Sequence, residues 1–299
     1  MKTIAERIRQ SGSDRALNTV VTLSVLLMMA MMLYPFIYTI SLSVSRPTAV
    51  MAGRVRFLPV GFETTAYVHV LREPRLVGAF SISIFYVLSG AVSLLVLGSL
   101  VAYPLSLRVV RVRRAVMFFI LFTMLFDGGM VPTFLWIKTL GMLDTVWAII
   151  LPTAMSAWYI IIYRTFLQQQ PESLRESALI DGANDFVILL RIVLPLAKPI
   201  IATLAIFQMV FQWNSYFPAL LYLRNEALMP VQIILRAVLE TARDVEAMIR
   251  AGGADEEIIT QPISIQAAFI VVIVFPIIVV YPFAQKYFTR GMMIGAIKG

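Results

Sequence analysis

Six long apolar blocks divide this sequence, and each can cross about 30 Å of hydrocarbon as a helix. The blocks lie at residues 16–44, 77–107, 114–137, 144–167, 199–223 and 262–284. Of the 299 residues, 60% are hydrophobic and only 14% are charged, which is typical of a membrane protein rather than of a large soluble core. The sequence therefore predicts an all-α membrane protein, with six transmembrane helices in a single domain over residues 1–299.

Several kinds of site are excluded by residue content. The chain has no Cys, so it can form neither disulfides nor thiolate metal sites, and its only His is His69, which we expect at the surface of an outer loop. No Gly-x-x-x-x-Gly-Lys-Ser/Thr phosphate loop is present, so the chain is not itself an ATPase. We therefore expect no catalytic residue, no metal site and no cofactor in this chain.

The distribution of Lys and Arg predicts the orientation in the membrane. The first apolar block is too long for a signal peptide and reads as an uncleaved first span. Basic residues gather in the N-terminal segment, in the loops after the second and fourth spans, and at the C-terminus. Because cytoplasmic segments carry such an excess, both termini are predicted to be cytoplasmic. The same bias explains the net charge of +8 without any nucleic acid.

The inner loop between the fourth and fifth spans, residues 171–195, reads as a helix, a turn and a second helix. Pro171 and Glu172 suit a first helical turn. Asp181 and Gly182 then end this helix, since glycine accepts a left-handed backbone and a close approach. A loop that only joins two spans could be shorter, so we predict a projection that fits a groove on another protein. An incidental amphipathic loop is the alternative.

This loop resembles the EAA motif of importer-type, binding-protein-dependent ABC permeases. The motif residues are Glu176, Ser177, Ala178, Asp181, Gly182 and Ala183, followed by Ile192, Leu194, Pro195 and Pro199. Nine residues separate Gly182 from Ile192, as in the family pattern, and Ser177 replaces the usual alanine. The resemblance implies a coupling helix that seats in a cleft of an ATPase subunit. It also implies that Glu176 pairs with a basic group there and that Gly182 permits the close turn.

The resemblance extends over nearly the whole chain and favours the sugar-importing branch. The segments that carry it are 129–133, 141–145, 164–166, 213–214 and, near the C-terminus, 281–288 with Gly291 and 295–299. The last of these resembles oligosaccharide permeases, some of which are linked to acidic sugars such as alginate or pectin fragments.

What this branch implies is a type I ABC importer permease in the bacterial cytoplasmic membrane. Its implied partners are a second related permease, two cytoplasmic ATPase subunits that bind ATP and Mg, an external solute-binding protein, the sugar and membrane lipid. The long outer loops at 45–76 and 224–261 either face such an external partner or are solvated surface.

A sugar pathway needs aromatic platforms with amide or carboxylate partners near the middle of the membrane. The fifth span provides such groups in Gln208, Gln212, Trp213, Asn214 and Tyr216. Polar side chains at this depth are costly unless satisfied, so they indicate either a wet pathway or hydrogen bonds between helices.

Two further pathway candidates lie in other spans. Trp158 suits either a pathway contact or packing at an interface. Asp127 is the one acid inside an apolar run, and it either faces the pathway or caps a helix break at Gly128 and Gly129.

Two other functions are open at this level. The chain can be an ABC permease for a peptide or an amino acid, because the motif does not specify the solute. An ion-coupled secondary transporter would bury several ionisable residues in its spans, and only Asp127 fits that description. We therefore predict alternating access that is driven by a separate ATPase.

Overall fold

The computed structural model describes residues 12–250 and 262–296, and the described residues are helical apart from turns, short connecting loops and one isolated β-bridge between Ser45 and Phe62. This confirms the predicted all-α class. The helices separate into two compact units, Met1–Arg72 with Val238–Val272 and Glu73–Ala237 with Ile273–Gly299. The predicted basic segment before residue 12, part of the predicted outer loop at 251–261, and residues 297–299 lie outside the described residues.

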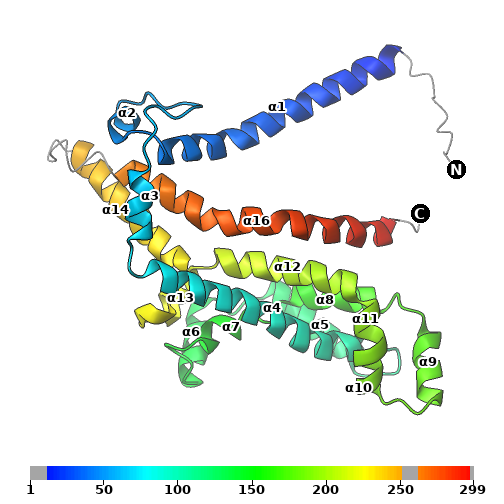
Figure 1. The fold of residues 1–299 in the computed structure, drawn as a ribbon. Coiled ribbons are helices and arrows are strands. Elements are labelled where there is room, and N and C mark those ends of the chain that lie inside the picture. The colour runs from blue at the N-terminus through cyan, green and yellow to red at the C-terminus, as the bar shows by residue number, and fades with distance from the viewer. Residues whose placement is uncertain (1–11, 251–261, 297–299) are drawn as a thin grey trace. The chain divides into compact units, whose positions relative to one another are not determined.

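In the first unit, α1 (Gly12–Ser43) is a long helix whose apolar side chains are exposed along most of its length. Two short helices follow it, α2 (Pro47–Met51) and α3 (Thr65–Leu71), and exposed His69 lies on α3 (Figure 1). The loop between them is held by two serines near the end of α1. The Ser41 hydroxyl donates to the Phe57 carbonyl at 2.9 Å, and Ser45 Oγ accepts from the Val60 amide at 3.0 Å.

In the second unit, α4 (Leu76–Ser106) is the central helix, and α8 (Ala157–Leu167) and α12 (Lys198–Asn214) pack against it (Figure 1). Small residues on α4 allow this approach, as is typical of helices in membranes. Gly90 faces α12, and Ser99 shares a 2.9 Å hydrogen bond with Tyr163 of α8. A buried cluster that includes Leu94 and Leu204 fills the space between the three helices.

A second buried cluster involves α6 (Met130–Thr139), α7 (Trp147–Ile150) and α13 (Phe217–Tyr222). Buried Tyr86 of α4 belongs to it, and its hydroxyl donates to the Leu228 carbonyl at 2.9 Å. Leu228 ends the short 3₁₀ turn η2 (Glu226–Leu228), which precedes α14 (Val231–Arg250).

Three of the six predicted spans are not continuous helices in the structure. The block at 114–137 forms α5 (Arg113–Leu125) and α6, which meet at an angle of 119°. The block at 144–167 forms α7 and α8 with a turn between them, and the block at 199–223 forms α12 and α13.

Each break has a local physical cause. Gly129 has a φ of 82°, a left-handed conformation that favours glycine, and the Asp127 carboxylate accepts from its amide at 2.9 Å. Pro152 lies in the turn between α7 and α8, and Pro218 lies at the start of α13. Proline has no amide hydrogen to donate, so each of these residues removes a backbone hydrogen bond that would continue the preceding helix.

The remaining three blocks each form one long helix. By length and composition the described residues contain three helices that can cross a membrane, Asp14–Ser43, Leu76–Ser106 and Ile263–Pro282. The number rises to as many as five if each of two bent helix pairs counts as one span. The last helix, α16 (Pro262–Ala296), continues beyond the predicted end at 284. The count of six spans in one domain stays a prediction.

Candidate functional site: the coupling segment and the polar end of α12

The predicted coupling segment, residues 171–195, folds as a helix, a turn and a second helical stretch. The first helix is α9 (Glu172–Ile180), and the second stretch consists of α10 (Asp185–Ile188), the π-helical turn η1 (Leu189–Val193) and α11 (Leu194–Leu196). Pro171 is the N-cap of α9, one residue before the first helical turn in which it was expected. The segment lies at one end of the second unit, where α9 is set apart from the central helices (Figure 1).

The turn after α9 depends on the backbone freedom of Gly182. This residue has a φ of 81°, and a β-carbon added to it would meet no atom within 4 Å. The left-handed conformation, rather than crowding, therefore favours glycine at this position. The turn is closed by the Ala183 amide, which donates to the Ala178 carbonyl at 2.9 Å.

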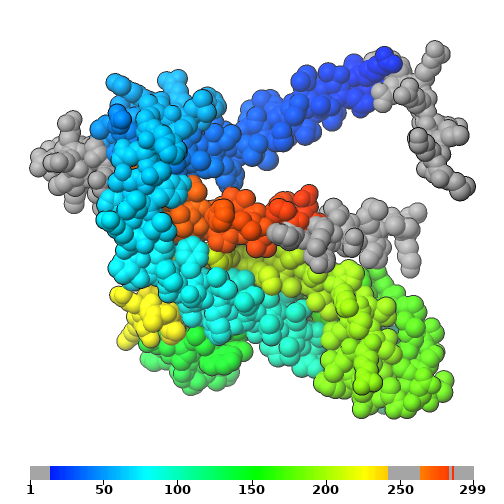
Figure 2. All heavy atoms as spheres, viewed as in Figure 1, coloured from blue at the N-terminus to red at the C-terminus, as the bar shows by residue number. Residues whose placement is uncertain are grey.

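The motif residues divide into an inward and an outward group. Ala178 is the one buried residue of α9, with 8% of its surface exposed, and it joins the core cluster against which Ala183 packs. Glu176, Ser177 and Asp181 are exposed. Ile180, at the end of α9, leaves 86% of its surface exposed. In the space-filling view this yellow-green part of the chain lies at one end of the second unit (Figure 2). The outward group is therefore available to a partner.

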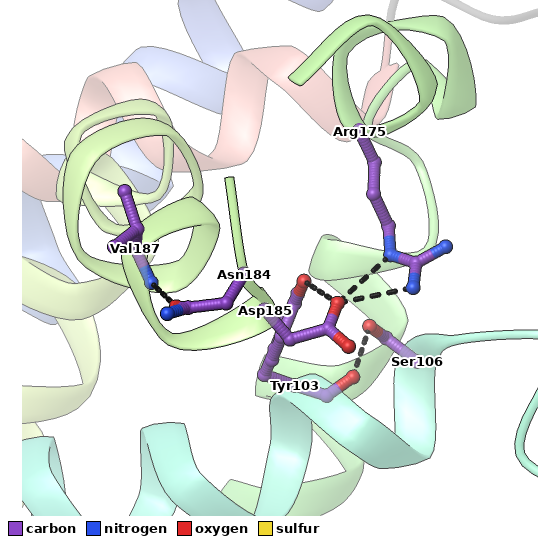
Figure 3. Close-up of polar contacts among 6 residues, drawn as sticks. All are labelled: Tyr103, Ser106, Arg175, Asn184, Asp185 and Val187. Atoms are coloured by element: carbon purple, nitrogen blue, oxygen red, sulfur yellow. Dashed lines mark hydrogen bonds and ion pairs between the residues drawn. The ribbon is translucent and has the colours of Figure 1, made fainter. Parts of the chain in front are cut away.

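A polar network joins α9 to α10 and α4, and sequence reasoning did not single it out. Arg175 of α9 donates from Nε at 3.2 Å and from Nη2 at 3.0 Å to Oδ1 of Asp185, and the Tyr103 hydroxyl donates to the same oxygen at 3.2 Å (Figure 3). Partial burial lowers the pKa of Arg175, but its hydrogen bonds with Asp185 and Tyr103 outweigh this and raise the pKa overall. The guanidinium thus stays charged.

A cavity of about 470 Å³ lies between α9 and the end of α4. Residues from both helices line it, together with the segment that leads into α9, and they include Tyr103, Ser106, Gln168, Pro171 and Arg175. The cavity means that α9 is not packed tightly against the helices behind it along its whole length.

The polar residues predicted on the fifth span separate into two groups. Gln208, Gln212 and Trp213 are buried, and both glutamines meet Thr153 in the turn between α7 and α8. The Gln208 amide donates to the Thr153 carbonyl at 3.1 Å, and the Thr153 hydroxyl donates to Gln212 Oε1 at 3.1 Å. The sequence allowed two interpretations of these glutamines, a wet pathway or hydrogen bonds between helices. The contacts with Thr153 are hydrogen bonds between segments.

Asn214, Tyr216 and Trp158 are exposed instead. Asn214 donates to the Val210 carbonyl of its own helix at 2.8 Å, and the guanidinium of Arg236 lies 5.7 Å from the centre of the Tyr216 ring. Trp158 packs edge-on against Phe207, with 5.8 Å between ring centres. These three residues remain candidates for a surface that a substrate meets.

Exposed Asp127 accepts from the Gly129 amide in the break between α5 and α6. The sequence predicted that Asp127 either faces the pathway or caps a helix break, and this hydrogen bond has the geometry of a cap. Among the described residues no group of three or more His, Cys, Asp or Glu side chains is placed to hold a metal ion.

We expect Gly90→Leu to destabilise the second unit. A β-carbon at Gly90 would lie 3.3 Å from Gln208 Nε2, so a larger side chain would push into the glutamine pair. Overpacking of this kind costs about 1–3 kcal/mol. The measurement is thermal unfolding in detergent. Gly78→Leu on the same helix is the matched control, because no atom lies within 4 Å of its added β-carbon. Equal melting temperatures for the two variants would contradict the prediction.

Comparison with known proteins identifies the family. Residues 94–294 match the family model described as the binding-protein-dependent transport system inner membrane component. The chain belongs to this family. The predicted ABC permease family is thereby confirmed, and the matched region contains both the coupling segment and the polar end of α12.

Relatives and a solved structure agree with the family. The chain is 40% identical to the polygalacturonan/rhamnogalacturonan transport system permease protein YtcP of Bacillus subtilis (strain 168), over 92% of this chain and 96% of the relative. It is also 40% identical to Protein LplC of the same strain, over 90% of each chain. A chain from the crystal structure of a bacterial ABC transporter involved in the import of the acidic polysaccharide alginate is 36% identical. That match has a TM-score of 0.83 and covers 93% of this chain and 98% of the other.

Proposed function

We propose that this chain is the membrane-spanning subunit of an ATP-driven importer for a sugar or oligosaccharide. The observation that carries the proposal is the coupling segment, in which α9 directs Glu176, Ser177 and Ile180 outward from an anchored turn. An ATPase subunit that seats on this surface would supply the energy, and the family membership supports such a partner.

The full complex that we propose has five proteins. A second related permease pairs with this chain, two cytoplasmic ATPases bind ATP and Mg, and an external binding protein delivers the sugar. The chain lies in the bacterial cytoplasmic membrane with both termini and the coupling segment on the cytoplasmic side, as the basic residues indicate. ATP binding and hydrolysis then switch the cavity between the permeases from outward-open to inward-open.

An acidic oligosaccharide is the substrate class that we favour. The names of two similar proteins refer to polygalacturonan and to the acidic polysaccharide alginate.

In this chain, the Arg236 guanidinium lies over the exposed Tyr216 ring. An aromatic ring suits the apolar face of a sugar, and a guanidinium suits a sugar carboxylate. Tyr216, with Asn214 beside it, is therefore our proposed contact surface. Buried Gln208, Gln212 and Trp213 support the surface from behind.

The proposal is tested in proteoliposomes that contain the complex purified with this chain. The probes are labelled trigalacturonate, neutral raffinose and a tripeptide. We expect ATP-dependent uptake of the charged trisaccharide in the presence of the binding protein. Uptake of the tripeptide alone would favour the peptide permease, and uptake driven by an ion gradient without ATP would contradict an ABC importer.

Arg236→Gln is expected to lower trigalacturonate uptake by about tenfold, since a charge-assisted hydrogen bond contributes about 1.5–3 kcal/mol. Raffinose has no carboxylate, so its uptake should change little. Arg224→Gln is the matched control, because Arg224 is an exposed cation before the same helix. An equal loss for the charged and the neutral sugar would contradict a carboxylate contact at Arg236.

A further inference from the structure

Helix α9 has few attachments to the rest of its unit. Ala178 is its one buried residue, and the 470 Å³ cavity lies between α9 and the end of α4. A force applied to the outward surface of α9 would therefore reach the long helices poorly through apolar packing alone. A polar contact that crosses from α9 to α4 would give the force a direct route to the central helix.

The polar network of Arg175, Asp185 and Tyr103 makes that crossing, and three of its hydrogen bonds meet at a single atom. Oδ1 of Asp185 accepts from Nε and Nη2 of Arg175 on α9 and from the hydroxyl of Tyr103 on α4 (Figure 3). One carboxylate oxygen on α10 is thus shared by three helices. We name this group the Asp185 clamp.

On both sides of the clamp, a neighbouring polar side chain holds the local backbone by a hydrogen bond. The Asn184 side chain caps α10 by accepting from the Val187 amide at 2.9 Å, which fixes the helix start where Asp185 lies. At the end of α4, the Ser106 hydroxyl donates to the Tyr103 carbonyl at 2.6 Å. Arg175 is anchored because its guanidinium reaches the carboxylate with two nitrogens, a geometry that lysine does not reproduce.

We propose that the Asp185 clamp makes α9 and the cytoplasmic end of α4 move as one body when an ATPase displaces α9. The inference rests on the proposed function for the source of the force. Arg175, Asp185 and Tyr103 are positioning residues, because they act on the long helices and touch neither sugar nor nucleotide.

The clamp is suited to transmission rather than to overall stability. The side chains of Arg175 and Asp185 are 22% and 56% exposed, and ion pairs this open to water contribute little to folding. Variants of the clamp should therefore fold, assemble and retain the ATPase. Their defect should be a looser connection between α9 and α4.

The test measures the distance between α9 and α4 in the purified complex. The chain has no cysteine, so spin labels can be placed at Leu88→Cys on α4 and Ser173→Cys on α9, both of which are exposed positions. Pulsed electron paramagnetic resonance then gives the distance distribution without nucleotide and with ATP and vanadate. We expect one narrow distribution in both states for the parent chain, and a wider, state-dependent one for Asp185→Asn.

Three further variants make the result specific. Tyr103→Phe removes one of the three hydrogen bonds and should widen the distribution less than Asp185→Asn. The distribution for Arg175→Gln combined with Asp185→Asn should be no wider than for Asp185→Asn alone, because both changes break the same ion pair. Glu73→Gln is the control, since it breaks the 2.9 Å ion pair with Arg75 outside the coupling segment, and it should leave the distribution unchanged.

The outcomes separate the clamp from the proposed function. An Asp185→Asn distribution that matches the parent would overturn the clamp, as would a parent whose distance changes with nucleotide as much as the variant's does. Absence of an ATPase from the purified complex would instead refute the importer. The nucleotide-free comparison would still test the clamp in that case.

Discussion

Gly182→Val is expected to lower transport by about tenfold or more while the chain still reaches the membrane. The φ of 81° at Gly182 costs an L-residue about 1–2 kcal/mol, and a β-branched side chain tolerates it least. No neighbour lies within 4 Å of the added β-carbon, so the strain falls on the turn itself and is relieved by moving α9. Uptake and ATPase retention should each fall by about tenfold or more, the equivalent of about 1.4 kcal/mol.

Two controls separate the turn from general destabilisation. Gly182→Asn should retain much of the activity, because asparagine adopts the left-handed conformation more readily than other residues. Gly141→Val introduces the same strain at a φ of 67°, also without neighbours within 4 Å, but outside the coupling segment. It should keep the ATPase bound. Normal uptake by Gly182→Val, or equal ATPase loss in Gly141→Val, would refute the role of this turn.

Ile180→Glu is expected to weaken ATPase binding by about thirtyfold, which corresponds to loss of a central apolar anchor contributing about 2 kcal/mol. Ile180 ends α9 with 86% of its surface exposed, next to exposed Leu179. An apolar cleft that accepts this side chain would have to desolvate the new carboxylate. The measurement is a titration of purified ATPase onto the chain in lipid nanodiscs.

Leu58→Glu is the matched control for this substitution. Leu58 is 76% exposed, and it lies in the loop between α2 and α3 that we predict on the opposite side of the membrane. Its replacement should leave the affinity for the ATPase unchanged. If both variants bound as tightly as the parent, Ile180 would not be part of the docking surface.

The long helices could be predicted from the sequence because hydropathy measures composition over many residues. The block at 77–107 is α4 (Leu76–Ser106) almost to the residue. The breaks could not be predicted, because proline is tolerated inside spanning helices. Pro276 and Pro282 lie within the continuous helix α16, whereas Pro152 and Pro218 lie at interruptions. Whether a proline interrupts a helix depends on the residues that pack around it, and the sequence alone does not show which residues these are.

In the candidate site too, features set by neighbouring residues could be predicted, whereas contacts between residues distant in sequence could not. The left-handed turn at Gly182 could be predicted because a glycine after an amphipathic helix specifies it locally. The Asp185 clamp could not, because Tyr103 is 82 residues away from Asp185 in sequence. The sequence shows that the glutamines of α12 are polar side chains in an apolar span, where burial without hydrogen bonds is costly. It does not show their partners, and only the folded structure brings Gln208 and Gln212 to Thr153.

The central claim is that the outward surface of α9 docks onto an ATPase, and a cross-link from that surface tests it most directly. In the naturally cysteine-free chain, Ile180→Cys can carry a thiol-linked benzophenone, which is activated by light in membranes that hold the whole complex. The account predicts one adduct, whose second protein is identified by mass spectrometry as a subunit with a nucleotide-binding phosphate loop. An adduct with a protein from outside the membrane, or none with the ATPase while it is bound in the same complex, would contradict the account.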